Sequence, residues 1–351
     1  MAATFAVVGA GWRTHFYLRI AQQMPWRYRC VGVVARDPDK ASLLKDLFGV
    51  PILTDVAQVA GARPDFVVTS VGWGDNPGIV RGLAEEGLDI LSETPPAPDV
   101  EAMRAMSDLL DRGAQIQVAE QVALRPNYQA LKAARLRLGE IDHVQVSVAH
   151  GYHGVSVVEE LLGVVGQRPT VRATSVASKI VAGPDRDGSP REERLKDSTT
   201  TLAWLDYGNG KTAVFDFTGD QYFAWIRASR ALVRGSRGEA DLIGARWLQD
   251  FETPLSAPFV RRETGSGDDL YNPSLSGITL GEEWVYRNPF AGARLSDDEI
   301  AIATMMDAVG TGVEIYPLAR AMHDHGVAIT IDRSAKSGEV EEVSEEPWHR
   351  S

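Results

Sequence analysis

Two imidazoles and a phenol lie close together near the middle of the chain, at His150, Tyr152 and His153. An imidazole exchanges a proton near neutral pH, and a neighbouring phenol can orient it through a hydrogen bond. These residues could therefore supply general acid–base chemistry. Two alternatives stay open. Such residues also serve as helix caps or core residues, and a metal site would need a third ligand that this spacing does not offer.

A second informative segment is the N-terminal stretch MAATFAVVGAGWRTHF. Its composition predicts a buried strand over residues 4–8, a sharp turn at Gly9 and Gly11, and a helix from Trp12 to Ile20. A strand that turns directly into a helix presents free backbone N–H groups, which can bind a pyrophosphate. Thr14 stands where a third glycine is usual, so an ordinary strand–helix turn remains the alternative.

Strand and helix patterns alternate through the first third of the chain, which predicts a parallel sheet with helices on both faces. The expected strands are Phe5–Val8, Cys30–Val34, Phe66–Ser70, Ile90–Leu91 and Ile116–Val118. The expected helices are Thr14–Gln23, Lys40–Leu47, Pro77–Glu86 and Val100–Arg112. This dinucleotide-binding domain should span residues 1–120.

The pattern changes after residue 120, where closely spaced strands separated by turns predict a large, mainly antiparallel open sheet backed by helices. The expected helices are Pro126–Leu138, Val155–Val165, Ser296–Ala308 and a shorter one at Pro317–Ser334. The expected strands are Ile141–Ala149, Val171–Ile180, Thr199–Asp206, Thr212–Phe217, Ala228–Arg234 and Glu239–Ile243. We expect a surface loop at Gly183–Lys196 and find little periodicity over Asp250–Asn288.

The fold class is therefore α/β, with an N-terminal doubly wound Rossmann domain and a C-terminal α+β domain over residues 121–338. Residues 339–351 form an acidic tail that we expect to be solvated. The formal net charge of −12 argues against non-specific nucleic-acid binding. No apolar run is long enough for a membrane span, and we find no secretory signal. The single cysteine, Cys30, fits a buried thiol in a cytoplasmic protein.

The order and spacing of these motifs over nearly the whole chain resemble the Gfo/Idh/MocA oxidoreductase family. The resemblance implies an N-terminal Rossmann domain and a C-terminal domain with a large open sheet. It also implies a bound NAD or NADP and a reaction on sugars, cyclitols or related polyols. Relatives commonly pair through the outer face of that sheet, so we expect a homodimer or homotetramer, with a sugar-like small molecule as ligand and neither nucleic acid nor membrane as partner.

Within this resemblance, NADP is slightly favoured over NAD. The second strand ends at Ala35 and Arg36, where an acidic residue usually binds the ribose of NAD and a guanidinium suits a 2′-phosphate. Arg36 could instead stack on the adenine, and Asp37 could supply the acid if the register differs. The cofactor-binding residues that the resemblance implies are Gly9, Gly11, Trp12, Arg13, Arg36, Gly72, Trp73, Asn76, Glu93, Thr94 and Gln121.

Two polar groups that the family usually places in its active site are replaced. The family's Glu-Lys-Pro motif is present here as Glu93-Thr94-Pro95, and a threonine hydroxyl cannot take over the proton transfer of a lysine. The usual aspartate position holds Ala149. The family's histidine matches His153, which we expect to accept a proton from a substrate hydroxyl, with Tyr152 or His150 orienting it or acting in its stead.

Several other polar and aromatic residues are weaker candidates. Arg125 could reach the cleft, and Lys179 could be an alternative acid. A stacking wall for a sugar ring could come from Trp204, Tyr207, Tyr222 and Trp225. We expect His323 and His325 near a helix C-terminus at the surface, and Asp197 and Asp220 as solvated loop carboxylates.

The leading hypothesis is an NAD(P)-dependent oxidoreductase that transfers a hydride between the nicotinamide and a carbinol or carbonyl carbon of a polyol. Two alternatives follow from the same residues. One is an enzyme that retains its cofactor and cleaves a glycosidic bond through transient oxidation. The other is a noncatalytic nucleotide-binding or regulatory protein, which the missing lysine and aspartate favour.

Overall fold

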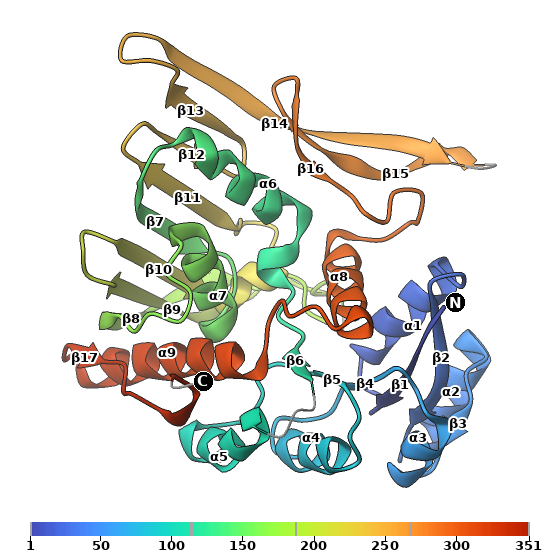
Figure 1. Cartoon of the computed structure of the whole chain (residues 1–351). Coiled ribbons are helices and arrows are strands. Elements are labelled where there is room, and N and C mark those ends of the chain that lie inside the picture. The colour runs from blue at the N-terminus through green and yellow to red at the C-terminus, as the bar shows by residue number, and fades with distance from the viewer. Residues whose placement is uncertain (1, 112–114, 187, 267–268, 350–351) are drawn as a thin grey trace.

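Two sheets form the framework of the molecule (Figure 1). The structure is a computed structural model that describes residues 2–111, 115–186, 188–266 and 269–349. The first sheet is parallel and the second is mainly antiparallel, which confirms the predicted fold class. In the described part of the chain, no helix combines the length and the apolar character that crossing a bilayer requires.

The first sheet contains six strands in the order β3-β2-β1-β4-β5-β6. The order reverses between β1 and β4, and such a switch point leaves a crevice at the carboxyl ends of the strands. Phe5, Val7 and Val68 are completely buried, because helices cover both faces of this sheet. The strands are β1 Ala3–Val8, β2 Tyr28–Val34, β3 Ile52–Leu53, β4 Phe66–Thr69, β5 Ile90–Ser92 and β6 Ile116–Val118.

The helices around this sheet follow the prediction closely, and α1 has the expected bounds. The short elements β3 and α3 escaped the sequence analysis because they are too short to show a period. The helix expected over Val100–Arg112 divides into α5 and a 3-10 turn, Ser107–Asp111, and residue 112 lies outside the described residues. The helices are α1 Thr14–Gln23, α2 Pro38–Phe48, α3 Ala57–Ala62, α4 Asn76–Glu85 and α5 Val100–Ala105.

The second sheet contains eleven strands in the order β16-β15-β14-β13-β12-β11-β7-β10-β9-β8-β17. Among the described strand pairs of this sheet, only β7 and β10 run parallel. The strands are β7 Ile141–Ser147, β8 Thr170–Val181, β9 Leu195–Asp206, β10 Thr212–Thr218, β11 Arg230–Gly235, β12 Gly238–Asp241, β13 Gly244–Leu248, β14 Pro254–Ser266, β15 Asp269–Leu280, β16 Glu283–Arg287 and β17 Glu341–Glu342.

Strands β14 to β16 occupy the region in which the sequence shows little periodicity. The ribbon that these three strands form exposes apolar side chains such as Leu270 and Tyr271, and Tyr271 is 98% exposed. Without one consistently buried face, the two-residue alternation that marks a strand does not develop. The pattern therefore could not reveal these strands.

Helices α6 (Pro126–Ala134), α7 (Gly151–Leu162) and α9 (Leu318–Ser337) cover one face of the second sheet (Figure 1). Helix α7 begins four residues before the predicted Val155. Tyr152 and His153 therefore lie in its first turn rather than in a strand-to-helix turn, and His150 precedes the helix as its N-cap residue.

Helix α7 lies very close to the sheet. A Cβ atom on Gly154 would come within 2.2 Å of the Phe215 ring, so only glycine permits this approach. Val155, Val158 and Leu162 are fully buried beneath it. Each such side chain contributes roughly 1.5–3 kcal/mol to stability, so the helix holds the side chains of its first turn firmly.

Helix α8 (Asp297–Thr311) follows the second sheet in the sequence but packs in the core of the first. Ser296 and Glu299 form a capping box at its start. The Arg19 guanidinium and the Glu299 carboxylate lie 2.7 Å apart and join α1 to α8. The chain therefore crosses back to the Rossmann layer before it forms α9. The domain boundaries at residues 120 and 338 stay a prediction.

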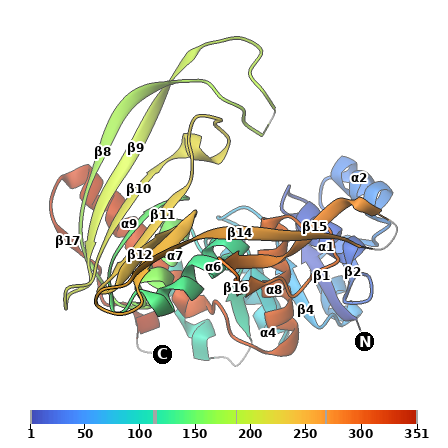
Figure 2. The ribbon, with the colours of Figure 1, turned by 90° about the horizontal axis from the view of Figure 1, so that it is seen from above.

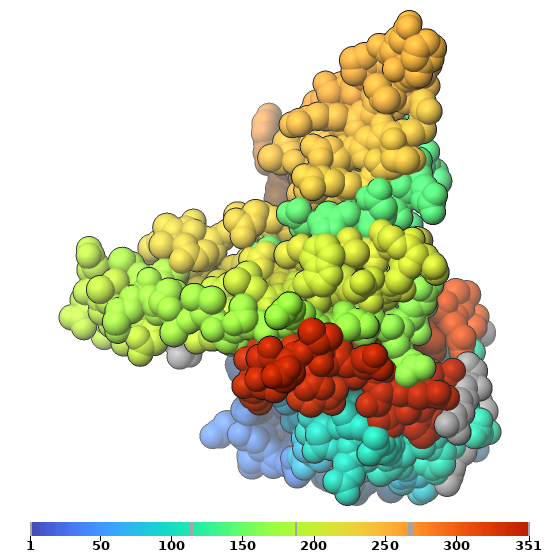
Figure 3. Space-filling model, turned by 90° about the vertical axis from the view of Figure 1, so that its left-hand side faces the viewer, coloured from blue at the N-terminus to red at the C-terminus, as the bar shows by residue number. Residues whose placement is uncertain are grey.

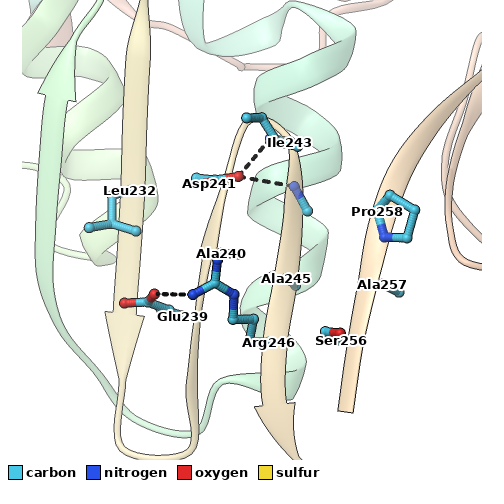
Figure 4. Close-up of a pocket in the computed structure, with 11 residues that line it drawn as sticks. Leu232, Glu239, Ala240, Asp241, Ile243, Ala245, Arg246, Ser256, Ala257 and Pro258 are labelled. Atoms are coloured by element: carbon cyan, nitrogen blue, oxygen red, sulfur yellow. Dashed lines mark hydrogen bonds and ion pairs between the residues drawn. The ribbon is translucent and has the colours of Figure 1, made fainter.

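The opposite face of the second sheet is open. A hollow of about 250 Å³ lies there on strands β11 to β14 (Figure 4), and its lining includes Leu232, Glu239 and Ile243. Asp241 accepts hydrogen bonds from the backbone N–H groups of Ile243 and Gly244 beside it. None of the lining residues belongs to the predicted site, and the oligomer expected through this face stays a prediction.

The C-terminal segment differs from the expected solvated tail. Strand β17 pairs with β8, and Trp348 is buried. The Glu346 carboxylate accepts two hydrogen bonds from Arg104, at 2.7 and 2.6 Å. The tail is acidic in composition, yet its described residues are held by strand pairing, apolar burial and one charged pair. The expectation of a solvated end is therefore wrong at Val343, Glu346 and Trp348, which are buried, whereas other residues of the segment, such as Val340, are exposed.

The sequence predicts that the last helix is shorter than α8, but α9 has 20 residues and α8 has 15. His323 and His325 lie in its first half and are buried, so the surface position near the helix C-terminus is wrong. Their placement follows from tertiary packing, because His323 contacts Glu159 of α7 and His349 of the tail, and His325 contacts Tyr152 of α7.

A buried polar network joins α7 to α9. His323 Nε2 and the Glu159 carboxylate lie 2.8 Å apart, and His323 Nδ1 lies 2.9 Å from His349 Nε2. The Tyr316 hydroxyl donates to Asp324. Burial raises the pKa of Glu159 to about 8 and also raises the pKa of Asp324, while it lowers the pKa of His323. All three directions favour neutral groups in the folded protein.

This network predicts that the protein loses stability as the pH rises. Glu159 ionises near its ordinary pKa of 4.5 in the unfolded chain but near 8 in the folded one. Its contribution is therefore complete below the lower value and is lost between the two, with a slope of up to ~1 kcal/mol per pH unit. Glu159→Gln, which mimics the protonated acid, should flatten the decline between about pH 6.5 and about pH 8.

The measurement is the free energy of unfolding in urea at both pH values. Glu86→Gln is the matched control, because Glu86 is exposed and no side-chain contact of it is recorded in the described structure. An equal pH dependence in the Glu159→Gln protein and the wild type would contradict the proposed neutral network.

Candidate functional site

The turn after β1 has the geometry of a phosphate-binding loop. Gly9 has a φ of +119°, and a Cβ atom there would lie 2.1 Å from the carbonyl oxygen of Ser70. The Thr14 hydroxyl donates to the Gly9 carbonyl at 3.0 Å, so the residue in place of the third glycine fastens the turn. Around Gly11 the nearest described atom would be 3.6 Å away, which leaves room for a ligand.

The N-terminus of α1 offers donors to an anion. No side chain caps it, and its first turn holds no acidic residue. Uncapped N–H groups at the end of an aligned helix attract a phosphate. Trp12 is about half exposed at this end, and the guanidinium carbon of Arg13 lies 4.4 Å from the centre of the indole. The loop therefore fits the pyrophosphate of a dinucleotide in both its shape and its donors.

Arg36, two residues after the end of β2, offers an exposed cation. The Arg36 guanidinium lies 3.2 Å from the Asp75 carboxylate, and both side chains are exposed. Asp37 caps α2 by accepting from the N–H groups of Asp39 and Lys40, so its carboxylate already has a structural role. Gly72 and the half-exposed Trp73 lie in the segment that follows the carboxyl end of β4, shortly before Asp75.

Asn76 does not face the crevice. Its amide nitrogen donates to Ser92 and to the Pro96 carbonyl at 2.9 and 3.1 Å, and its oxygen accepts from Thr69 at 2.7 Å. It is 1% exposed and has three protein partners. Asn76 therefore holds the loop that contains Thr94 in place, and it influences the site through that loop.

The loop after β5 places Glu93 and Thr94 beside the cluster on α7. Glu93 accepts from the backbone N–H and the hydroxyl of Thr94, at 3.1 and 3.3 Å. A cis peptide joins Thr94 to Pro95. The Thr94 side chain is hydrogen-bonded to Tyr152, while burial raises the pKa of Tyr152 well above its usual range. Tyr152 therefore stays a neutral phenol, a hydrogen-bond donor rather than a base.

The most informative contact of the site joins His153 to Glu120. The Glu120 carboxylate is hydrogen-bonded to Nδ1 of the imidazole, and both side chains are buried. The other Glu120 oxygen accepts from the backbone N–H of Val122 at 3.1 Å. A carboxylate at Nδ1 fixes the tautomer in which Nε2 carries a lone pair. His153 is therefore arranged to accept a proton at Nε2.

His150 has a different environment. Burial, and next the neighbouring His153, lower the pKa of His150 to about 4, so the ring is neutral at physiological pH. The Tyr222 hydroxyl accepts from the His150 backbone N–H at 3.2 Å and is also hydrogen-bonded to Nδ1 of the ring. The rings of His150 and His153 meet edge to face with centres 5.0 Å apart. His150 therefore buttresses His153 rather than acting as an acid.

Gln121 connects this cluster to the glycine loop. With its amide oriented so that the nitrogen donates to the Ala119 carbonyl, its oxygen accepts from Arg13 at 3.0 Å. Arg13 also lies 3.4 Å from Asp298 on α8, and Arg125 contacts the same carboxylate at 2.8 Å. Adjacent residues, Glu120 and Gln121, thus hold the imidazole and the phosphate loop respectively. The structure brings the two predicted halves of the site together here.

The weaker candidates lie elsewhere or have other partners. Lys179 is exposed and pairs with Asp197 on β8 and β9. Trp204 and Trp225 are exposed outside the cluster, and Tyr207 is buried beside Glu159. The predicted stacking wall is therefore reduced to Tyr222. Asp197 is solvated but belongs to a strand, and Asp220 is neither exposed nor free, since it pairs with Lys196 at 2.6 Å.

One group of described side chains has ligand atoms close enough for a metal ion. Oxygen and nitrogen atoms of Glu159, His323 and Asp324 lie within 4.8 Å of one another. All three belong to the buried network between α7 and α9, where His323 and Tyr316 already use ligand atoms as hydrogen-bond partners. Burial favours the protonated form of both carboxyl groups, and a protonated carboxyl group is a poor metal ligand, so the network favours a structural role.

The sequence analysis missed the roles of Glu120 and Tyr222 in the proton-handling cluster. Glu120 lies 33 residues before His153, and no local spacing rule connects two residues so far apart. A signal was present, because Glu120 is a carboxylate directly after the apolar strand β6. Burying a carboxylate in that position costs free energy unless a hydrogen-bond or charge partner accompanies it.

Comparisons with known proteins bear on the dinucleotide-binding domain and on the fold. Residues 3–121 match the model of the Gfo/Idh/MocA family, described as an oxidoreductase family with an NAD-binding Rossmann fold. A search of curated protein sequences finds no match for the chain. The family match covers the domain that carries the glycine loop, Glu120 and Gln121.

Solved structures share the fold of the whole chain at low sequence identity. Levoglucosan dehydrogenase, solved with NADH and levoglucosan, has a TM-score of 0.70 at 14% identity over 98% of this chain and 100% of that one. The WlbA dehydrogenase of Chromobacterium violaceum, solved with NADH and UDP-GlcNAcA, has a TM-score of 0.62 at 15% identity, over 98% of this chain and 96% of that one. An oxidoreductase from Agrobacterium radiobacter, solved with NAD+, L-tartaric acid and magnesium, has a TM-score of 0.66 at 15% identity, over 98% of this chain and 99% of that one.

The glycine loop predicts a separation of stability from binding. Gly9→Ala should lower the melting temperature, because its Cβ atom would meet the Ser70 carbonyl and its φ is strained. Gly11→Ala should leave the melting temperature unchanged and weaken NADH binding, because only a ligand would meet the added methyl group. Calorimetric melting and titration with NADH measure the two effects. Unchanged NADH affinity in the Gly11→Ala protein would contradict a pyrophosphate at this turn.

Proposed function

We propose that this chain, whose N-terminal domain belongs to the Gfo/Idh/MocA oxidoreductase family, is an NAD(P)-dependent oxidoreductase acting on a sugar, cyclitol or similar polyol. The observation that carries the proposal is the buried hydrogen bond between Glu120 and His153. It prepares His153 as a proton acceptor, and its carboxylate partner Glu120 is adjacent in sequence to Gln121, which contacts the phosphate-binding loop through Arg13. Proton transfer and dinucleotide binding then occur at the same junction.

His153 handles the proton in this proposal. Nε2 accepts the proton of a substrate hydroxyl, and in the reverse direction it returns the proton to the carbonyl oxygen. Glu120 stabilises the imidazolium that forms, because its carboxylate accepts the Nδ1–H. A bound nicotinamide supplies the acceptor or donor of the hydride. Correct placement of these groups supplies most of the rate enhancement, since the chemistry needs one positioned base.

The remaining polar groups orient the substrate. The neutral Tyr152 phenol and the Thr94 hydroxyl can each donate or accept a hydrogen bond, and neither changes charge near neutral pH. Thr94 occupies the position of the family's lysine, so the proton transfer passes to the imidazole alone. Loss of that imidazole should therefore be more damaging here than loss of one member of a lysine–histidine pair.

The substrate class follows from relatives only by analogy. The neighbouring structures were solved with levoglucosan and with a UDP-sugar, among other ligands. Hydroxyl-rich molecules also suit a site that presents a phenol, a hydroxyl and two imidazoles as hydrogen-bonding groups. The noncatalytic alternative rests on Thr94 and Ala149, and it predicts cofactor binding without turnover on any polyol.

The central test compares three variants with NAD+ and NADP+ on a panel of polyols, followed by nicotinamide absorbance. His153→Ala should lower kcat/KM by about 100-fold or more. Glu120→Gln should lower kcat less and shift the pH profile of kcat/KM, because the amide no longer stabilises the imidazolium.

His143→Ala is the matched control. His143 lies on β7 beside Thr212 and Trp204, away from the cluster, and its removal should leave kcat/KM unchanged. Melting temperatures of all variants exclude unfolding as the cause of a loss. Full turnover by the His153→Ala protein would refute the assignment of the base. Tight NADH binding without turnover by the wild type would favour the noncatalytic alternative.

We further propose that Arg36 decides between NADP and NAD, with NADP slightly preferred. The exposed guanidinium can bind a 2′-phosphate once it leaves Asp75. Arg36→Ala should weaken NADPH binding about tenfold and leave NADH binding nearly unchanged. Calorimetric titration with both nucleotides measures this. Equal losses for the two would show that Arg36 contacts a group that they share, such as the adenine.

A further inference from the structure

The hairpin of β8 and β9 is longer than the sheet that supports it. The two strands pair along their full length, from Thr170 with Asp206 to Val181 with Leu195. Strand β10 accompanies β9 only as far as Thr200. Residues 177–181 and 195–199 therefore leave the sheet as a two-stranded arm (Figure 2). In the space-filling view the arm projects from the body of the molecule above the Rossmann domain (Figure 3).

The far end of the arm is fastened rather than free. Lys196 pairs with the largely buried Asp220 at 2.6 Å, and the hydroxyls of Ser198 and Thr218 lie 3.1 Å apart. Gly183 lies so close to the segment after β10 that a Cβ atom would come within 3.1 Å of the Cα of Ala224. These contacts fix the direction in which the connection between β8 and β9 extends.

That connection reaches the phosphate-binding loop. The guanidinium carbon of Arg186 lies 4.6 Å from the centre of the Trp12 indole. Trp12 directly follows Gly11, at the uncapped end of α1. The charge of Arg186 also acts on the hydroxyl of Tyr222 and opposes the rise that burial causes in its pKa. Arg186 thus lies between the glycine loop and the cluster on α7.

Arg186 differs from the other guanidinium on Trp12 in its charge partners. Arg13 is neutralised in part by Asp298 at 3.4 Å. In the described part of the chain, no carboxylate is recorded within ion-pair distance of Arg186, and its recorded ring contact is Trp12. In a chain with a net charge of −12, a cation at the mouth of a ligand site for which the described residues provide no recorded acidic partner is informative.

Stacking on an aromatic ring holds a guanidinium in an orientation that favours anion binding. The indole face orients the planar group and leaves its N–H edge free for a bidentate bond to phosphate or carboxylate. We propose that Arg186 is an anion-binding residue of the cleft, which the β8–β9 arm places over the glycine loop to bind a phosphate or carboxylate of the ligand. This inference rests on the proposed function. The anion is either the pyrophosphate of the dinucleotide or an acidic group of the second substrate.

The test uses the full-length wild type and the variants Arg186→Ala, Arg186→Lys and Arg191→Ala. Arg191 is an exposed arginine of the same connection and controls for the loss of one surface charge. The first arm measures the dissociation constant of NADH by calorimetry. The second arm saturates each protein with NADH and titrates D-glucuronate, a sugar that carries a carboxylate.

If the pyrophosphate is the anion, Arg186→Ala weakens NADH binding about tenfold or more, and Arg191→Ala does not. If a substrate carboxylate is the anion, NADH binding is unchanged and only the Arg186 variants lose glucuronate. Arg186→Lys should retain part of the affinity in either case, because it keeps the charge and loses the bidentate edge.

Equal behaviour of Arg186→Ala and Arg191→Ala in both arms would overturn the inference and leave the proposed function intact. Failure of the wild type to bind either NADH or NADPH would overturn the proposed function, and this inference with it. The two failures are therefore distinguishable within one set of titrations.

Discussion

A buried carboxylate needs a partner, and the partner that Glu120 finds is the imidazole of His153. This one hydrogen bond joins the end of the Rossmann sheet to the first turn of α7. Leaving either group unpaired in the interior would cost several kcal/mol. The contact therefore helps to hold the Rossmann domain against α7, and it leaves Nε2 as the imidazole nitrogen that faces no carboxylate partner in the pair. The same hydrogen bond thus satisfies a buried carboxylate and fixes the tautomer of the imidazole.

The rest of the site depends on that pair. Gly154 brings α7 against the sheet so that His153 can reach Glu120, and Asn76 secures the loop that presents Thr94. Gln121 and Arg13 then tie the junction to the phosphate loop. The family that the chain resembles usually divides proton handling among lysine, aspartate and histidine, and this chain has Thr94 and Ala149 at two of the corresponding positions. A glutamate from the Rossmann side supplies the carboxylate instead.

Local physical signals made part of this structure predictable. The apolar run into Gly9, the bounds of α1 and five of the six parallel strands follow from periodicity and turn chemistry. The same local signals identified the glycine loop, and the family resemblance pointed to His153. Contacts between distant segments carried no such signal. Glu120, Tyr222 and Arg186 reach the site from three different segments. The anchored tail and the partly exposed ribbon of β14 to β16 also depart from what their local polarity patterns indicate. Tertiary packing decided these features, and a single sequence does not encode them in any short window.

The most direct measurement is a crystal structure of the wild-type protein with NAD+ bound. The pyrophosphate should lie at the N-terminus of α1, and the nicotinamide ring should face the space in front of His153 Nε2, with Nδ1 still bonded to Glu120. Room for one carbinol group should remain between the ring and the imidazole. A nicotinamide that points away from α7, or an imidazole detached from Glu120 in that complex, would contradict the assignment of His153 as the proton acceptor.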